Sequence, residues 1–452
     1  MIKYNSKYMG NSYACKRALY VTIVFASFFY GCDTKVDSDR DGIPDKNDSC
    51  KMVAAKGTKN GCPIVPKIGK PHLYVETSAS MGGYFKNDAE FKTIVSDLAV
   101  KIDREISPMA IYLVADSVAA YKQGTIQFSS DIATTAIANQ KSSQLSEIIR
   151  DIAAKTKGND VSIFVSDCIL SFPNTVVKKN WEINKTEAPN ALKNSIFATF
   201  SDLKKNGLAA SVYAFKSKFY GNYYDYHNVK TKLNGESRPF YIWVIAKGAI
   251  LSQFDQKLAD ISSFKPEKNL HFGLIDNAIK DYAIIPQIER GGTWGKENGK
   301  SLKDVEINKL EKLKVCLAVN LSSLPIYARE ISYLNENLQV ITTGCKAKVE
   351  VKKKEDLNTS KLNNNNQKLQ VDAATHGFLL EVNQMDLDNG TVRLILPRKY
   401  DTWFKDWSSM DDKNIAGTTN KTFAFEYLVQ GVIEAYDTKD KNYLDLQITL
   451  NK

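Results

Sequence analysis

The chain has 452 residues, of which 43% are hydrophobic and 10% aromatic, so it can bury a sizeable core in two or three domains. Its formal net charge is +10, and residues 1–31 contribute four of the basic side chains and no acidic ones, which leaves 57 Lys and Arg against 51 Asp and Glu. No stretch interleaves aromatic and basic residues as a nucleic-acid groove does, and four histidines without HExxH spacing argue against a zinc hydrolase. We therefore expect no nucleic-acid partner.

The first 31 residues have the parts of a secretory signal peptide. The basic side chains come first: Lys3, Lys7, Lys16 and Arg17. An apolar run over 18–30 follows, too short for a membrane-spanning helix, and Gly31 precedes the cut site. Residues 29–32, Phe-Tyr-Gly-Cys, resemble the lipobox of bacterial lipoproteins, although the aromatics depart from its usual residues. The resemblance implies that Cys32 carries a lipid anchor; the alternative is an ordinary signal peptide with an incidental cysteine.

Acidic residues then recur at the spacing of a calcium-binding loop. Counting Asp37 as position 1, carboxylates occupy positions 1, 3, 5, 9 and 12, a glycine occupies position 6, and the backbone carbonyl of position 7 is available. The expected ligands are Asp37, Asp39, Asp41, Ile43, Asp45 and Asp48. Gly42 allows the sharp turn, and Asp48 replaces the usual Glu with a shorter reach, which lowers the expected affinity. No amphipathic helix flanks the loop, so an EF-hand pair is excluded.

This loop resembles a single thrombospondin type-3 repeat. The resemblance implies bound Ca²⁺ and a disulfide between Cys50 and Cys62. The alternative is a solvated acidic linker. Residues 63–71 contain three prolines and a glycine, which predicts a short stiff spacer before the folded body.

Residues 72–262 alternate apolar runs with amphipathic segments. The runs predict strands over 72–76, 109–114, 161–165, 209–215 and 239–246. The amphipathic segments predict helices over 85–106, 143–156 and 192–203. This alternation indicates βα units and an α/β fold with a mostly parallel sheet. In such sheets, ligands bind at the carboxyl ends of the strands.

Polar residues stand at two of those ends. Glu76, Ser78 and Ser80 follow the first strand, and Asp167 follows a central one. The pattern resembles a von Willebrand factor A domain, a Rossmann-like fold whose metal-ion-dependent adhesion site contains Asp-x-Ser-x-Ser, a Thr and a later Asp. The resemblance implies Mg²⁺ or Ca²⁺ at these residues, with one position left open for a carboxylate of a protein partner. Glu76 departs from the family's Asp, and Ser143, or Ser142 beside it, is the best counterpart of its Thr.

Two other interpretations of these residues remain open. Ser78 or Ser80 could simply cap a helix after the strand. A hydrolase is the other, but no Gly-x-Ser-x-Gly occurs, and Glu76 with Asp167 lacks the further ligands of a metal phosphatase. We therefore expect no enzyme. The Tyr-rich segment 219–226 indicates either a hairpin covering the sheet edge or a loop facing a partner.

From residue 263 the pattern changes to short, often alternating apolar runs. They lie at 314–320, 339–343, 346–351, 377–382 and 391–396 and predict a mainly antiparallel β-sandwich. Residues 352–370 are predicted to be a long mobile loop. A helix over 422–436, with Trp403 and Trp407 before it, is predicted to pack on the sandwich, and 443–450 is the last strand. Cys316 and Cys345 are candidates for a second disulfide, whereas Cys168 has the apolar surroundings of a buried thiol.

Together these interpretations predict four parts. They are a signal peptide (1–31), an anchor with a calcium repeat and spacer (32–71), an A-like domain (72–262) and a β-sandwich-like domain with a C-terminal helix (263–452). We expect an outer-membrane lipoprotein of the cell envelope, facing the periplasm or the surface, that binds a protein partner through its metal-dependent site. A metal-free scaffold for an envelope complex and a metal-dependent hydrolase are the alternatives.

Overall fold

The computed structural model of the chain describes residues 42–44, 46–48, 61, 66–134, 145–169, 181–307 and 311–452, with only the backbone at 181–186. The chain divides into two compact units, residues 1–62 and 63–452. Several predicted features lie outside the described residues: the signal peptide, Cys32, Asp37, Asp39, Asp41, Asp45, Cys50, Cys62 and Ser143. Their roles stay predictions.

In the smaller unit, the described residues of the predicted calcium loop adopt a turn. Gly42 has a φ of +98°, a backbone conformation that glycine adopts at little cost. The side chain of Asp48 is buried and lies against Gly61, where any Cβ atom would overlap the carboxylate. The turn predicted at Gly42 is therefore present, and Asp48 packs within its own unit.

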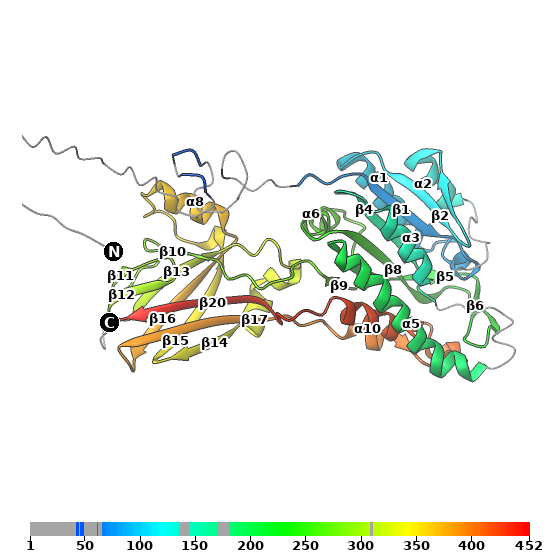
Figure 1. The fold of residues 1–452 in the computed structure, drawn as a ribbon. Helices are drawn as coiled ribbons and strands as arrows, with labels where there is room; N and C mark the ends of the chain where they lie inside the picture. The colour runs from blue at the N-terminus through cyan, green and yellow to red at the C-terminus, as the bar shows by residue number, and fades with distance from the viewer. Residues whose placement is uncertain are drawn as a thin grey trace, which may run out of the picture. The chain divides into compact units, whose positions relative to one another are not determined.

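The larger unit contains a seven-stranded mixed sheet in the order β3-β2-β1-β4-β8-β5-β9 (Figure 1). Its strands are β1 (Pro71–Glu76), β2 (Ala110–Val114), β3 (Val118–Tyr121), β4 (Val161–Ser166), β5 (Leu208–Phe219), β8 (Glu236–Lys247) and β9 (Lys268–Phe272). β1 pairs in parallel with β2 and β4, and the other neighbouring pairs are antiparallel. Every strand predicted for residues 72–246 is present, with shifted ends.

The prediction of a mostly parallel sheet is wrong for its second half. β5 continues through the small hairpin β6 (Asn222–Tyr224) and β7 (Lys230–Lys232) and returns as β8, which inserts between β4 and β5. A strand that returns through a hairpin must run antiparallel to the strand it left. The Tyr-rich segment forms this hairpin, with Tyr223 and Tyr226 buried. The predicted boundary after residue 262 is also wrong, because β9 joins this sheet.

Helices cover both faces of the sheet. One buried cluster joins the sheet to α1 (Glu90–Glu105), α2 (Gly124–Thr134) and α6 (Gly248–Ala259). The other joins it to α3 (Leu145–Lys155), α5 (Trp181–Lys205) and α10 (Phe425–Ala435). Successive residues of β1 and β4 enter opposite clusters, as alternation along a strand requires. These strands are buried on both faces, so their ends are held in place by packing from two sides.

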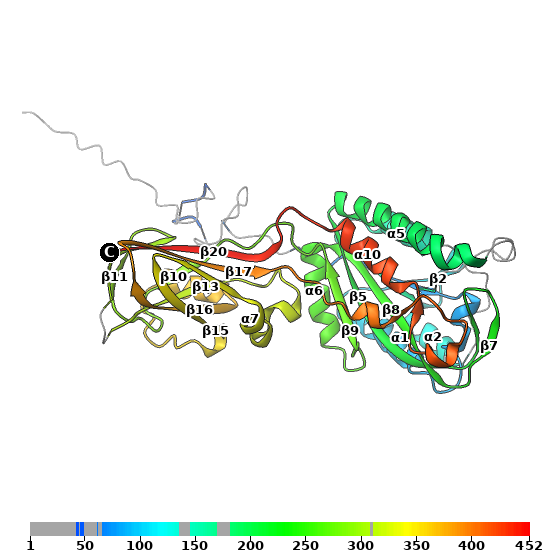
Figure 2. The same cartoon turned by 90° about the horizontal axis from the view of Figure 1, so that it is seen from below.

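The C-terminal helix packs on this sheet and not on the second-half strands, which corrects the sequence prediction. α10 lies beside α5 in both views of the fold (Figures 1 and 2). The indole of Trp403, in α9 (Trp403–Asp406), donates a hydrogen bond to the carbonyl of Asn269 at 3.0 Å. The hydroxyl of Tyr436 donates to the carbonyl of Leu208 at 2.7 Å. Helix periodicity reveals an apolar face but not the surface that covers it.

The second half forms two sheets that share one buried cluster. The first is β10 (Ala283–Ile285), β13 (Leu313–Val319), β16 (His376–Met385) and β15 (Cys345–Lys353), in that spatial order. The second is β11 (Thr293–Lys296), β12 (Ser301–Glu306), β20 (Asn442–Asn451), β17 (Asn389–Pro397) and β14 (Gln339–Thr343). All pairs are antiparallel except β12 with β20. The mainly antiparallel pairing predicted for this region is confirmed.

The mobile loop predicted for this half is wrong, and the candidate disulfide is absent from the described residues. Residues 352–370 contain the short helix η3 (Lys354–Asp356) and most of α8 (Asn365–Ala373), where the side chain of Asn364 accepts the backbone N–H of Asn366 at 2.8 Å. The helix is thus started by a side-chain cap. Cys316 and Cys345 are both buried, and they are free because β16 lies between their strands, β13 and β15. The thiol of Cys168 is free and buried as predicted.

The remaining short elements connect these parts. They are η1 (Ala79–Gly83), η2 (Ile326–Arg329), α7 (Ile331–Asn337), β18 (Ser408–Ser409), η4 (Ile415–Gly417) and β19 (Thr422–Phe423). Among the described residues, no helix has the length and apolar character needed to cross a membrane.

Candidate functional site

The parallel pairing of β1 with β4 brings the predicted site residues to one edge of the sheet. Val75 is paired with Val165, so Glu76 and Ser166 end their strands side by side. β1 leads through Ser78 into η1, which contains Ser80, and β4 leads directly into Asp167. The middle of each strand, residues 73–75 and 163–165, is apolar and fully buried, and the polar residues Glu76 and Ser166 end the strands.

Hydroxyl groups connect the two strand ends. The hydroxyl of Ser166 donates a hydrogen bond to Oε2 of Glu76 at 2.5 Å and accepts the backbone N–H of Cys168 at 2.8 Å. The Oγ atoms of Ser78 and Ser80 share a hydrogen bond at 2.9 Å. Ser78 precedes η1 but its side chain makes no capping hydrogen bond, so the helix-capping interpretation does not hold for Ser78.

Asp167 is the least satisfied member of the site. It is 1% exposed, and its Oδ1 accepts the backbone N–H of Ile169 at 3.1 Å. Its Oδ2 is buried and has no hydrogen-bond partner among the described residues. A buried carboxylate oxygen without a partner is costly, because it has lost its water without replacement. This atom is therefore positioned to accept a donor or a cation.

The two carboxylates disturb each other's ionisation. Burial, and then the charge of Asp167, raise the pKa of Glu76 to about 7, against the opposing hydrogen bonds from Ser166 and Ser78. Burial also raises the pKa of Asp167, opposed in turn by the backbone N–H of Ile169, the charge of Arg238 and the hydroxyl of Ser80. Two buried acids at one strand edge favour either a retained proton or an added positive charge.

Sequence reasoning missed the third charged residue, Arg238. It begins the buried part of β8, and because β8 runs antiparallel to β4 its first residues lie at the end of β4. Arg238 is 1% exposed, donates to the carbonyl of Thr419 at 3.1 Å, and places its Cζ atom 4.2 Å from the ring centre of Tyr223. Its Nη2 atom is buried and unpartnered within the described parts of the chain. No local motif marked this position, because it depends on the β5–β8 hairpin.

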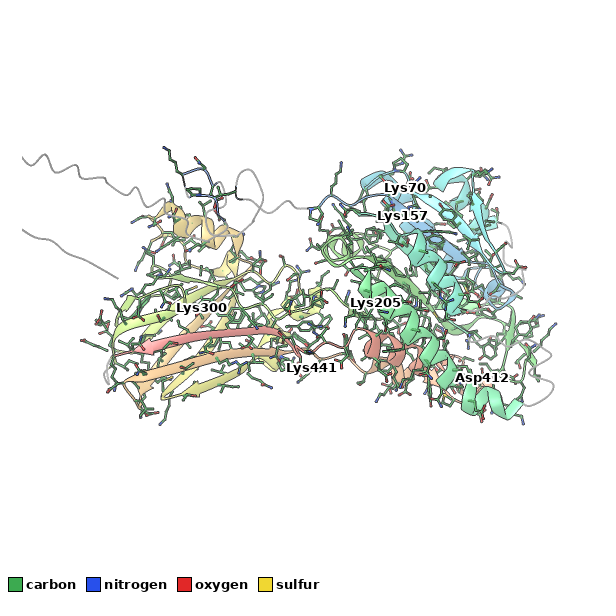
Figure 3. All side chains as sticks on the ribbon, viewed as in Figure 1. Lys70, Lys157, Lys205, Lys300, Asp412 and Lys441 are labelled. Carbon is green, nitrogen blue, oxygen red and sulfur yellow. The ribbon has the colours of Figure 1, made fainter. Side chains whose placement is uncertain are left out.

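A further carboxylate arrives from the C-terminal segment. It belongs to Asp412, which is labelled in Figure 3. Oδ2 of Asp412 accepts a hydrogen bond from the hydroxyl of Tyr223, and its Oδ1 accepts the backbone N–H of Tyr226 at 3.0 Å. Burial raises the pKa of Asp412. Tyr223 thus contacts Asp412 through its hydroxyl and Arg238 through its ring. The C-terminal segment helps to build the polar end of the sheet.

A second buried polar cluster contains the residue types of a nucleophilic triad. Oγ of Ser211 lies 2.7 Å from Nδ1 of His271, and Oδ2 of Asp255 lies 3.0 Å from the same nitrogen. In a triad the serine and the acid contact opposite ring nitrogens. All three side chains are buried, so this arrangement reads as interior hydrogen bonding and lacks the geometry of a relay.

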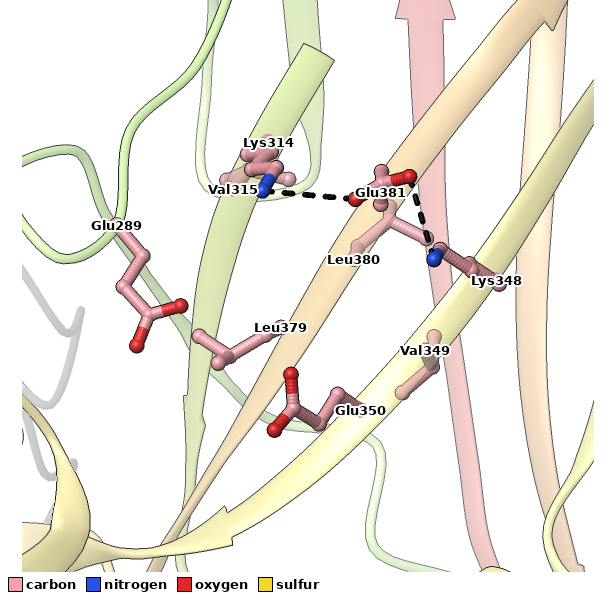
Figure 4. Close-up of a pocket in the computed structure, with 9 residues that line it drawn as sticks. All are labelled: Glu289, Lys314, Val315, Lys348, Val349, Glu350, Leu379, Leu380 and Glu381. Atoms are coloured by element: carbon pink, nitrogen blue, oxygen red, sulfur yellow. Dashed lines mark ion pairs between the residues drawn. The ribbon is translucent and has the colours of Figure 1, made fainter. Parts of the chain in front are cut away.

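The outer face of the four-stranded sheet carries a cavity of about 100 Å³ lined by lysine and glutamate side chains (Figure 4). Lys312, Lys314 and Lys348 lie 3.0, 3.5 and 3.4 Å from the carboxylate of Glu381. Ligand pockets commonly span about 300–1,000 Å³, so this cavity is small for a cofactor or drug-sized ligand. The exposed ion pairs also satisfy each other's charge.

No protein-family model, curated protein or solved structure matches this chain. Within the described ranges, no group of three or more His, Cys, Asp or Glu side chains could hold a metal ion. The oxygen donors at the end of β1 and β4 are two carboxylates and the hydroxyls of Ser78, Ser80 and Ser166. A cation at this place would therefore be bound by hydroxyl as well as carboxylate oxygens.

Proposed function

We propose that this chain binds a protein partner through a divalent cation held by Ser78, Ser80 and Asp167, with Glu76 beside it. The observation that carries the proposal is the buried Oδ2 atom of Asp167, which has no hydrogen-bond partner among the described residues, next to a second acid whose pKa is raised to about 7. A cation would relieve both features at once, because positive charge favours the ionised form of each carboxylate.

The donor set fits a hard cation. Carboxylate and hydroxyl oxygens are the ligands that Mg²⁺ and Ca²⁺ prefer, and the site offers no thiolate or imidazole among Glu76, Ser78, Ser80 and Asp167. When bound, such an ion supplies a coordination position for an acidic oxygen of the partner. This is the chemistry of the von Willebrand factor A adhesion site, which the sequence resembles. The parallel β2-β1-β4 core supports the likeness, and β8 beside β4 departs from the parallel order expected of it.

The rest of the proposal concerns where the protein is located in the cell. The signal-peptide pattern and the lipobox-like Cys32 favour an anchored protein of the cell envelope, and the acidic loop 37–48 favours a calcium-stabilised spacer. The turn at Gly42 supports the loop. In this proposal the β-sandwich-like second half, which follows the A-like domain in the chain, contributes no cation ligand.

A metal-free scaffold is the second candidate, and Arg238 is the observation that favours it. Its buried positive charge acts on Asp167 and already does part of what a cation would do. A nearby guanidinium also repels a divalent ion. The two candidates differ in one measurable property, because only the first predicts that Mg²⁺ or Ca²⁺ stabilises the fold through Ser78.

Thermal unfolding with and without added Mg²⁺ or Ca²⁺ tests this difference. A ligand that binds only the folded state stabilises it by RT ln(1 + L/Kd), where L is the free ligand concentration, so the unfolding midpoint rises with ligand concentration. We expect Ser78→Ala to lose most of the part of the shift that belongs to this site. Ser130→Ala, which removes an exposed hydroxyl on α2, should keep it. Equal shifts in both variants would favour the scaffold.

A further inference from the structure

A second cavity, of about 450 Å³, is lined by the last turn of α6, by η2 and by the residues where β15 ends and β16 begins. Its volume lies within the range of about 300–1,000 Å³ that is common for ligand pockets. Contacts beside the cavity hold its walls together. The hydroxyl of Ser252 in α6 donates a hydrogen bond to the carbonyl of Ser322 at 3.0 Å, and the ring centres of His271 and Tyr327 lie 6.0 Å apart.

One wall of this cavity carries a guanidinium group that the chain does not fully satisfy. Arg329 lines the cavity from the end of η2, and its Nε atom is buried without a hydrogen-bond partner among the described residues. Burial lowers the pKa of Arg329, against the charges of Asp255 and Glu330. Its cation has therefore lost more hydration than those carboxylates replace. A ligand carboxylate in the cavity would supply the missing negative charge.

A neutral histidine fixes the backbone of this wall. Nε2 of His376 donates a hydrogen bond to the carbonyl of Arg329 at 2.8 Å, and Nδ1 lies 2.9 Å from Oγ1 of Thr375. Burial lowers the pKa of His376, so its ring stays neutral near pH 7. The guanidinium is thus presented from a backbone that is already held in place, which reduces the entropy lost when a ligand binds.

The last turn of α6 forms a wall of opposite sign. Gln256, Ala259 and Asp260 line the cavity there. The C-terminal end of a helix carries partial negative charge, and the exposed carboxylate of Asp260 adds a full charge to it. Lys257, the basic residue of the same turn, does not line the cavity. This wall therefore favours a cation.

The other charged residues around the cavity offset one another. The ammonium of Lys353 lies 3.3 Å from the carboxylate of Glu330, and Lys354 is followed in the chain by Glu355. The charges that remain are the guanidinium on one wall and the carboxylate on the other. A ligand with a single charge would pair with one wall and leave the other without a partner.

We propose that this cavity binds a small zwitterion of the amino-acid and short-peptide class. Its carboxylate would pair with Arg329, because a guanidinium matches a carboxylate with two parallel hydrogen bonds. Its ammonium would lie at the last turn of α6, beside Asp260. The inference goes beyond the proposed function and does not rest on it, since the cavity shares no residue with the polar end of the central sheet.

Calorimetric titration of the full chain with the dipeptide alanyl-alanine tests the proposal. Two derivatives of the dipeptide each lack one charge: the N-acetyl form has no ammonium, and the C-terminal amide has no carboxylate. We expect the dipeptide to bind about tenfold more tightly than either derivative, because each derivative loses one charge-assisted contact. Equal affinities of the three compounds, or no binding of the dipeptide, would overturn the proposal.

Two variants should change this order of affinities in different ways. Arg329→Met should bind the dipeptide and its amide equally, and Asp260→Asn should bind the dipeptide and its acetylated form equally. Arg393→Met and Asp202→Asn, which change exposed residues outside the cavity, should keep the parent's preferences. Each comparison is made within one variant, so a change in stability does not affect it. A parent-like preference in both cavity variants would place the dipeptide elsewhere and contradict the assigned site.

Discussion

At the end of the central sheet the charged side chains are buried, whereas on the outer face of the four-stranded sheet a partly buried Glu381 is surrounded by exposed lysines. The pKa of Glu76 is raised, first by burial, and the pKa of Glu381 is lowered, first by the hydrogen bond from Lys312. The pKa of a glutamate carboxyl group is therefore raised in the first region and lowered in the second. A ligand cation would therefore stabilise the buried acids, whereas Glu381 is already paired with lysines and would be stabilised little by one.

Replacing a buried and an exposed arginine should sharpen this comparison most. Arg238→Met removes a hydrogen bond to Thr419 and the contact with Tyr223, and it removes the buried positive charge that acts on Asp167. We expect a loss of about 2–4 kcal/mol in the free energy of unfolding, measured with denaturant.

The matched control is Arg393→Met. Arg393 forms two hydrogen bonds with Asp445, each 2.6 Å long, but is 44% exposed. Exposed ion pairs contribute little, so this variant should unfold close to the parent. Equal losses in the two variants would contradict the contrast between buried and exposed charge.

The pH dependence of stability is the next largest effect. Because the pKa of Glu76 is about 7 in the folded chain and lower when unfolded, the folded state holds the extra proton between about pH 4.5 and 7. Stability in a chelator should therefore fall as the pH rises through this window and then level off. Glu76→Gln should remove about 2–3 kcal/mol of that fall, and Mg²⁺ or Ca²⁺ should reduce it in the parent.

Glu381→Gln is the control for this effect. The lysines around Glu381 hold its pKa below the usual range, so the carboxylate is ionised in both states across the window. Its removal should leave the slope of stability against pH unchanged between pH 5 and 8. A slope that Glu76→Gln does not reduce would show that Glu76 is not the group that retains the proton.

The position of the paired acids could be predicted from sequence, because strand ends in a parallel pair meet at one edge. Arg238 could not, since its place depends on a hairpin that inserts β8 beside β4. The sheet on which α10 packs could not be predicted either, because the apolar face of a helix does not show which surface covers it. Helix α8 could have been predicted from Asn364, which caps it, but the polar composition of residues 352–370 favoured a loop.

A smaller effect is expected at Asp412, whose carboxylate accepts hydrogen bonds from Tyr223 and Tyr226. Asp412→Asn keeps an acceptor oxygen but removes the negative charge from the neighbourhood of Arg238. We expect a loss of about 1 kcal/mol in the free energy of unfolding near neutral pH. Asp411→Asn, one residue earlier and exposed, is the control and should change little. A larger loss than that of Arg238→Met would reverse the assigned importance of the two groups.

Cation titration by calorimetry tests whether a divalent cation binds at the end of β1 and β4. The titration should use the full chain carrying Asp41→Asn, which disables the predicted calcium loop, with and without Asp167→Asn. We expect heat of Mg²⁺ or Ca²⁺ binding in the first protein and its loss in the second. No heat in the first protein, or the same heat in both, would contradict a cation at the end of β1 and β4.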